Sequence, residues 1–105
     1  GKGGKEFTVE AIACFFYVAS YEGCHKQSME QELGLSVAPG SRNTDLLSKY
    51  HRLKLPNGEA RPGLDLIIKK EDPGNRRKIK LYLTQKGKRT IDKFKSILYK
   101  DLYNI

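Results

Sequence analysis

A change of periodicity in the second half of the chain restricts the fold more than any other feature. Residues 78–83 alternate polar and apolar side chains, and an apolar segment at 64–70 precedes them. Such alternation is typical of a half-buried β-strand. The segment between them contains Pro73-Gly74, which favours a tight turn. We therefore predict a β-hairpin with its tip at residues 71–77. Its core-facing side chains are expected to be Ile79, Leu81 and Leu83, and its outward side chains Lys78, Lys80 and Tyr82.

Helical patterns lie on both sides of this hairpin. Thr8 and Thr84 are good N-caps, because a threonine oxygen can accept from the exposed amides of a first helical turn. Gly34 interrupts the apolar spacing between two shorter segments, which predicts a turn between two helices. The predicted helices cover residues 9–21, 27–33, about 39 or 41 to 53, and 85–103.

The order of three helices, a hairpin and a final helix predicts a winged helix-turn-helix. The fold class is α+β and mostly helical, with a two-stranded wing. The 105 residues are expected to form one domain. No apolar run is long enough to span a bilayer, so no membrane association is expected. The predicted parts are a flexible basic arm (1–6), the helix-turn-helix (27–53), the wing (64–83) and a C-terminal helix (85–103).

Positive charge is concentrated in one part of the chain. Residues 69–100 carry twelve Lys and Arg against three Asp and Glu, whereas the rest carries eight basic and nine acidic residues. A basic segment on a nearly neutral body is typical of a protein that binds a polyanion. Some of these lysines could instead belong to a solvated helix face.

The remaining chemistry of the sequence points away from catalysis. Cys14 and Cys24 lie outside any metal-ligand spacing, and neither histidine has an evident catalytic partner. We expect no metal, no cofactor and no enzymatic activity. Two unpaired cysteines favour a reducing, cytoplasmic location, which includes association with the nucleoid.

The wing carries a resemblance to a known family. Residues 72–87 read DPGNRRKIKLYLTQKG, which resembles the wing of the MarR family of regulators in its arginine pair and its Leu-Thr-x-x-Gly ending. The segment Glu32-Leu33-Gly34-Leu35-Ser36 and the start Ser41-Arg42 of the next helix are similar to that family's turn and recognition helix. The chain differs in having Asn75 where the family usually has Asp, and in an apparent inserted loop at 55–63. It is also short for the family.

The resemblance and the chemistry of DNA together imply a set of contacts. A recognition helix enters the major groove, and wing arginines reach the minor groove or the phosphates. Asp72 and Asn75 are expected to orient the wing arginines. The predicted DNA-binding residues are Ser41, Arg42, Asn43, Thr44, Lys49, Arg76, Arg77, Lys78 and Lys80.

These observations predict a sequence-specific double-stranded DNA-binding protein that regulates transcription. The long apolar stripe of the last helix predicts a homodimer, and no small-molecule effector is expected. Two other readings remain open, because a fold does not determine a function. One is DNA binding in replication, segregation or packaging, and the other is a winged helix that binds RNA or protein.

Overall fold

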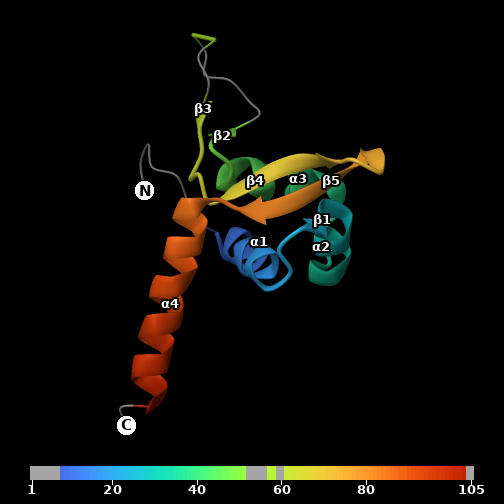
Figure 1. The fold of residues 1–105 in the computed structure, drawn as a ribbon. Helices are drawn as coiled ribbons and strands as arrows, with labels where there is room; N and C mark the ends of the chain where they lie inside the picture. The colour runs from blue at the N-terminus through green and yellow to red at the C-terminus, as the bar shows by residue number, and fades with distance from the viewer. Residues whose placement is uncertain (1–7, 52–56, 59–60, 104–105) are drawn as a thin grey trace.

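The computed structural model describes residues 8–51, 57–58 and 61–103, and the predicted arm at 1–6 lies outside them (Figure 1). Helices surround a three-stranded antiparallel sheet of order β1-β5-β4, and a second sheet pairs β2 with β3. In chain order the elements are α1 (Val9–Ser20), β1 (Cys24–His25), α2 (Lys26–Leu33), α3 (Val37–Leu47), β2 (Tyr50–His51), β3 (Arg61–Pro62), β4 (Ile67–Asp72), β5 (Asn75–Leu83) and α4 (Gln85–Tyr103).

The first two helices follow the prediction closely. The Thr8 hydroxyl accepts a hydrogen bond from the backbone N–H of Ala11 (3.1 Å) and so caps α1. The α1 residues that enter the core are spaced three and four apart, as one helix face requires. Gly34 ends α2 with a φ of 68°, a left-handed conformation that favours glycine. The core consists of Cys14, Phe15, Val18, Met29, Leu47, Leu66, Ile67, Leu81 and Ile91.

The wing is present, but its turn is tighter than predicted. β4 continues to Asp72 and β5 begins at Asn75, so Pro73 and Gly74 alone form the turn. Leu81 is fully buried and Ile79 and Leu83 are half-buried, which agrees with the predicted inner face. Of the side chains predicted to face outward, Lys78 is exposed, whereas Lys80 and Tyr82 are half-buried because β5 is the central strand of the sheet. The prediction that the arginines stand on the hairpin tip was wrong. Arg76 and Arg77 lie within β5, where the pairing with β4 shifts register between Glu71 and Asp72, so that Ile79 faces Glu71 and Asn75 faces Asp72.

The third helix differs from the prediction at both ends. It begins at Val37, since a proline at the third position still lies in the first turn and breaks no helical hydrogen bond. It ends at Leu47 instead of Leu53. The segment that follows β3 bonds to the last carbonyls of the helix: the Leu64 N–H donates to the Leu46 oxygen (2.8 Å) and the Leu66 N–H to the Leu47 oxygen (2.7 Å). A longer α3 would need those same acceptors.

The segment that joins the wing to α4 shows why its sequence is so specific. The Thr84 hydroxyl donates to the Asp65 carbonyl (2.6 Å) and accepts from the Gly87 N–H (2.9 Å). A Cβ atom at Gly87 would lie 2.1 Å from the Leu66 carbonyl oxygen, so no side chain fits there. These contacts fix the start of α4 against the end of β5.

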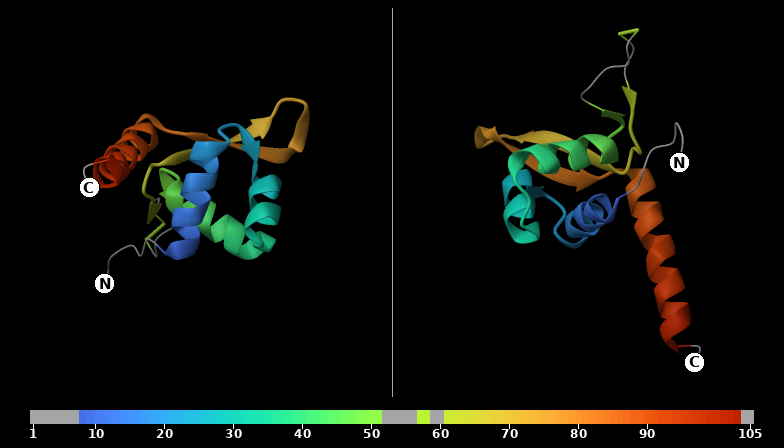
Figure 2. Two further views of the ribbon diagram at one scale, coloured as in Figure 1. Left: turned by 90° about the horizontal axis from the view of Figure 1, so that it is seen from below. Right: turned by 180° about the vertical axis from the view of Figure 1, so that it is seen from behind.

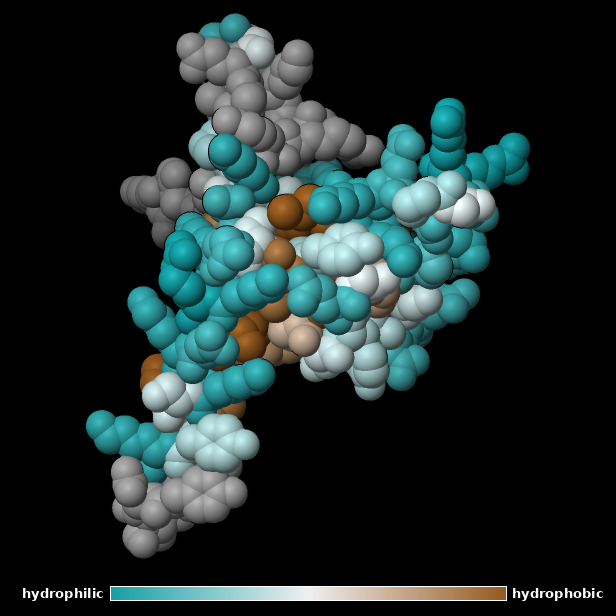
Figure 3. All heavy atoms as spheres, viewed as in Figure 1, coloured by the Kyte–Doolittle hydropathy of each residue, from teal (hydrophilic) through white to brown (hydrophobic). Residues whose placement is uncertain are grey.

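α4 projects from the body, and only its first turns pack on it (Figures 1 and 2). Ile91 is buried in the core, whereas Phe94, Ile97 and Leu98 are exposed. The wing extends from the opposite end of the sheet, and its surface is mostly hydrophilic (Figure 3). Within the described residues, no helix has the apolar length to cross a membrane.

Candidate nucleic-acid interface

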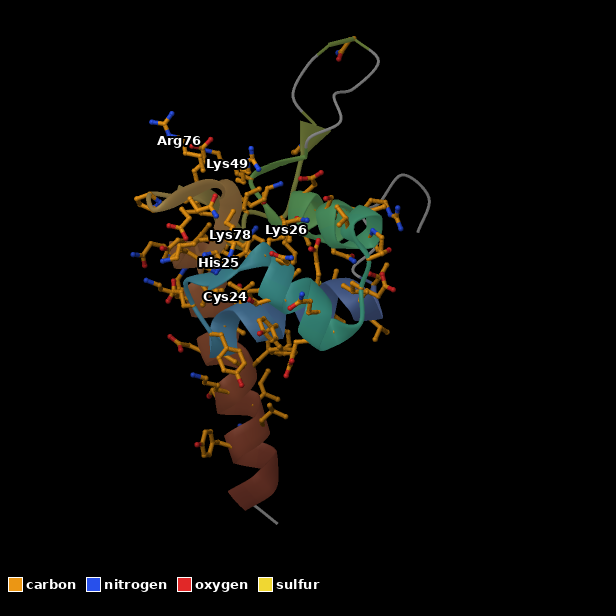
Figure 4. All side chains as sticks on the ribbon, turned by 90° about the vertical axis from the view of Figure 1, so that its right-hand side faces the viewer. Cys24, His25, Lys26, Lys49, Arg76 and Lys78 are labelled. Atoms are coloured by element: carbon orange, nitrogen blue, oxygen red, sulfur yellow. The ribbon has the colours of Figure 1, made fainter. Side chains whose placement is uncertain are left out.

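A groove of about 240 Å³ separates the wing from the helix-turn-helix. We call it the wing groove. Its walls come from the start of α2, the start of α3 and the strand β5. The α2 side and the β5 side of the groove both supply cationic side chains, and Figure 4 shows Lys26 of α2 and Lys78 of β5 on the same side of the molecule. The lining residues are His25, Lys26, Gln27, Glu30, Val37, Arg77, Lys78 and Ile79.

The wing offers a row of exposed cations. Arg76, Arg77 and Lys78 are exposed, and Arg76 extends outward beyond the hairpin (Figure 4). Within the described part of the chain, no ion pair or hydrogen bond engages the charged ends of these three side chains. Lys80 is half-buried, and its cross-strand neighbours are Lys70 and His25. Positive charge on this surface is therefore only weakly compensated by the protein itself.

Asp72 and Asn75 have roles other than the predicted orientation of wing arginines. The Asp72 carboxylate bonds His25 Nε2 (2.7 Å) and accepts from the Gly74 N–H (2.8 Å), so it fastens the turn to β1. The hydrogen bond from His25 and then that from Gly74 lower the pKa of Asp72. Asn75 accepts from the backbone N–H of Arg77 (3.1 Å). Both residues order the wing backbone and leave the guanidinium groups available.

The predicted contacts of α3 divide into two groups. Arg42 and, just past the helix, Lys49 are exposed, and Ser41 is half-buried. The expected DNA contacts of Asn43 and Thr44 were wrong, because both side chains are buried against the body.

Their hydrogen bonds give the reason. The Asn43 amide donates to Glu10 Oε1 of α1 (3.2 Å) and to the Pro39 carbonyl (2.9 Å). The Thr44 hydroxyl donates to the Gly40 carbonyl (3.0 Å). Buried polar groups whose hydrogen bonds are already made inside the fold are not available to bind a ligand. These two residues hold α3 in position.

An ion pair connects the wing to α3. Lys69 of β4 donates to Asp45 of α3, whose side chain is only 3% exposed. The His25–Asp72 pair attaches the wing turn to β1, which leads directly into α2. The wing is thus held to the body at two separate points.

Three features of the wing groove were not predicted from the sequence. Lys26 begins α2 and pairs with Glu30 one turn later. Glu30 in turn packs tightly against Gly40 of α3. The strand β1, which brings His25 to the groove, is two residues long and has no detectable alternation. The spacing of Lys26 and Glu30 was a readable signal for a helical ion pair. The approach of Glu30 to Gly40 depends on tertiary packing, so no local pattern could have revealed it.

No protein-family model matches the chain, and neither does any curated protein. Solved structures do resemble it. The PcaV transcriptional regulator from Streptomyces coelicolor matches with a TM-score of 0.66 and 19% identity, over 90% of this chain and 60% of that one. A MarR-like transcriptional regulator from Thermotoga maritima matches with a TM-score of 0.64 and 21% identity, over 100% of this chain and 67% of that one.

A third match was solved with nucleic acid. FabT of Streptococcus pneumoniae, in complex with DNA, matches with a TM-score of 0.63 and 15% identity, over 96% of this chain and 65% of that one. The fold is a MarR-like winged helix. This confirms the architecture predicted from the sequence. The chain spans between 60% and 67% of the length of these solved proteins, and at such identities the likeness concerns the fold.

Within the MarR-like fold, α2 and α3 form the helix-turn-helix and β4 and β5 form the wing. The wing groove lies where these two parts meet. Arg42 and the wing cations belong to elements that border it, and Lys49 follows just after α3, whereas α4 leaves the body at the other end of β5.

Proposed function

We propose that this chain binds double-stranded DNA and regulates transcription in a sequence-specific manner. The observation that carries the proposal is the row Arg76, Arg77 and Lys78, exposed and without partners among the described residues, across the wing groove from α3. Clustered cations without internal partners suit a phosphate backbone. The likeness to FabT in complex with DNA supports the same reading.

In this proposal α3 enters the major groove and the wing follows the backbone or the adjacent minor groove. Arg42 is the base-reading candidate of α3, since arginine can bond both acceptors of a guanine edge. Ser41 and Lys49 would contact phosphates. The wing cations Arg76, Arg77, Lys78 and Lys80 would supply most of the electrostatic attraction.

We further propose that the protein is a homodimer in the cytoplasm and that α4 forms the interface. Phe94 is 39%, Ile97 57% and Leu98 57% exposed, more apolar surface than a projecting helix of a monomer usually keeps. Phe16 of α1 contacts Phe94 (5.7 Å between ring centroids) and continues this apolar face onto the body. Two-fold symmetry could then bring two α3 helices about 34 Å apart, one turn of DNA.

The dimer is tested by charge substitution on α4. Leu98→Glu should convert the dimer to a monomer, because a buried unpaired carboxylate opposes association. Lys93→Glu, an exposed change elsewhere on the same helix, should leave the dimer intact. Sedimentation or light scattering gives the mass of each. Monomeric wild-type protein at micromolar concentration would refute the proposed interface.

DNA binding is tested with duplexes selected from a random pool. The variant Arg76→Ala/Arg77→Ala should weaken binding to every duplex by tenfold or more, since each lost charge-assisted phosphate contact costs about 1 kcal/mol or more. The matched variant Lys88→Ala/Arg89→Ala removes the same charge from exposed positions on α4, and should have a much smaller effect. Equal losses in the two variants would contradict a wing-centred site. Binding to duplex RNA in preference to DNA would contradict the proposed partner.

A further inference from the structure

Val37 is an apolar side chain in an unusual position. It is the first residue of α3 and is 69% exposed, yet it also lines the wing groove. A β-branched residue contributes little to helix stability there. Gly40 and Thr44, three and seven residues further along the same side of α3, are buried against the body, whereas the Val37 side chain stays exposed at the first turn. Neither helix formation nor packing explains a valine at this point.

The accessible residues at the start of α3 lie on two adjoining sides of the helix. Val37 and Ser41 are four residues apart and share one side, and Ala38 and Arg42 share the next one round. Val37, Ala38 and Arg42 are exposed, and Ser41 is half-buried. The first turn of α3 therefore presents an apolar row, Val37 and Ala38, and the following turn presents Ser41 and Arg42.

We infer that Val37, with Ala38 beside it, reads the 5-methyl group of thymine in the major groove. This inference rests on the proposed function. Thymine alone among the four bases presents a methyl group in that groove, and apolar side chains recognise it by contact. The apolar row has no hydrogen-bonding side chain to offer the other bases until Ser41.

The charge of the groove favours DNA over a protein as the occupant of this surface. Arg77 and Lys78 line the same groove as Val37 and have no ion-pair partner among the described residues. They would bind the phosphates beside a base edge held against the start of α3. The preferred site therefore contains a thymine at the base pair nearest the start of α3.

The test uses duplexes selected from a random pool by the full chain, in which each thymine is replaced singly by deoxyuridine. This removes one methyl group and leaves the hydrogen-bonding edge unchanged. At one thymine per half-site, affinity of the wild type should fall about three- to fivefold, the effect of one buried methyl group. The variant Val37→Ser should bind the thymine and deoxyuridine duplexes equally well.

Val9→Ser is a matched control. Val9 is also the first residue of a helix and is 83% exposed, but it does not line the wing groove. This variant should keep the full preference for thymine. A thermal unfolding curve for each variant confirms that the fold is retained.

The outcomes separate the inference from the function on which it rests. Duplex binding with no thymine sensitive to methyl removal overturns the inference and leaves DNA binding intact, as does a selection that yields no preferred sequence. A methyl effect that persists in Val37→Ser overturns the assignment to Val37. The proposed function itself is refuted if the chain binds no duplex, or if an acidic protein and not DNA binds in the wing groove.

Discussion

The wing and α3 border the same groove, but they reach it in different ways. The wing presents Arg76, Arg77 and Lys78 at three consecutive exposed positions near the start of β5, before the strand packs Ile79 and Leu81 against the body. α3 presents only part of its polar surface, because Asn43 is hydrogen-bonded to α1 and Thr44 to a backbone carbonyl in the first turn of α3. A polar residue on a helix is therefore weaker evidence for a ligand contact than a cation on a projecting hairpin.

The difference has a geometric cause. On the wing, the pairing of β5 with β4 shifts register near the turn, so residues 75–78 are all exposed and none of the cations among them has to pack inward. In a helix each residue turns by 100°, so residues three or four apart share a side. Asn43 lies four residues before the buried Leu47 and therefore faces the body, although its side chain is polar.

The largest effect that bears on this comparison concerns the inner side of the wing. Leu81 is fully buried, so Leu81→Ala should lower the free energy of unfolding by about 2–5 kcal/mol. Lys80→Ala, the next residue along β5, should change it by less than about 0.5 kcal/mol. Urea unfolding measures both. Similar losses would mean that the alternation does not define the faces of the wing.

A smaller effect separates the two sides of α3. Asn43→Ala removes the hydrogen bonds to Glu10 and Pro39, so stability should fall by about 1 kcal/mol. Arg42→Ala should leave stability within about 0.5 kcal/mol of the wild type, because its side chain is exposed. It should instead relax the sequence preference at one base pair. Unfolding curves and binding assays on both variants distinguish these effects. If Asn43→Ala relaxed the sequence preference and left stability unchanged, Asn43 would be a DNA contact.

The smallest effect concerns the attachment of the wing turn. The hydrogen bond from His25 lowers the pKa of Asp72, so this carboxylate stabilises the fold above its pKa in the unfolded chain. That contribution is lost as the pH falls through the lower pKa of the folded state. His25→Ala should raise the pKa of Asp72 towards its ordinary value, as NMR titration of the carboxyl carbon would detect. Gln27→Ala should leave this titration unchanged, and an unaltered pKa in His25→Ala would contradict the attachment.

Some of the fold was readable from the sequence because local rules decide it. Thr8, Gly34 and the alternation around Leu81 predicted a helix start, a helix end and a buried strand face. The same reading failed where distant segments compete for backbone groups. The end of α3 depends on Leu64 and Leu66, which return from beyond a loop to bond its last carbonyls.

The candidate site shows the same division. The wing cations were predicted from charge and a turn motif. Arg76, Arg77 and Lys78 are exposed in the structure, whereas Lys80 is half-buried. Lys26 and Val37 were missed, since only tertiary packing brings the starts of α2 and α3 to the edge of the wing groove. The pairing of Asp72 with His25 joins residues 47 positions apart and has no local signature.

The salt dependence of duplex binding tests the central claim most directly. Each phosphate contact contributes about −0.9 to the slope of log K against log salt concentration. The variant Arg76→Ala/Arg77→Ala should reduce the magnitude of this slope by about 1.8 per protomer, and Lys88→Ala/Arg89→Ala should leave it close to the wild-type value. A slope that is unchanged by the wing variant, or reduced equally by both, would contradict a wing that grips the DNA backbone.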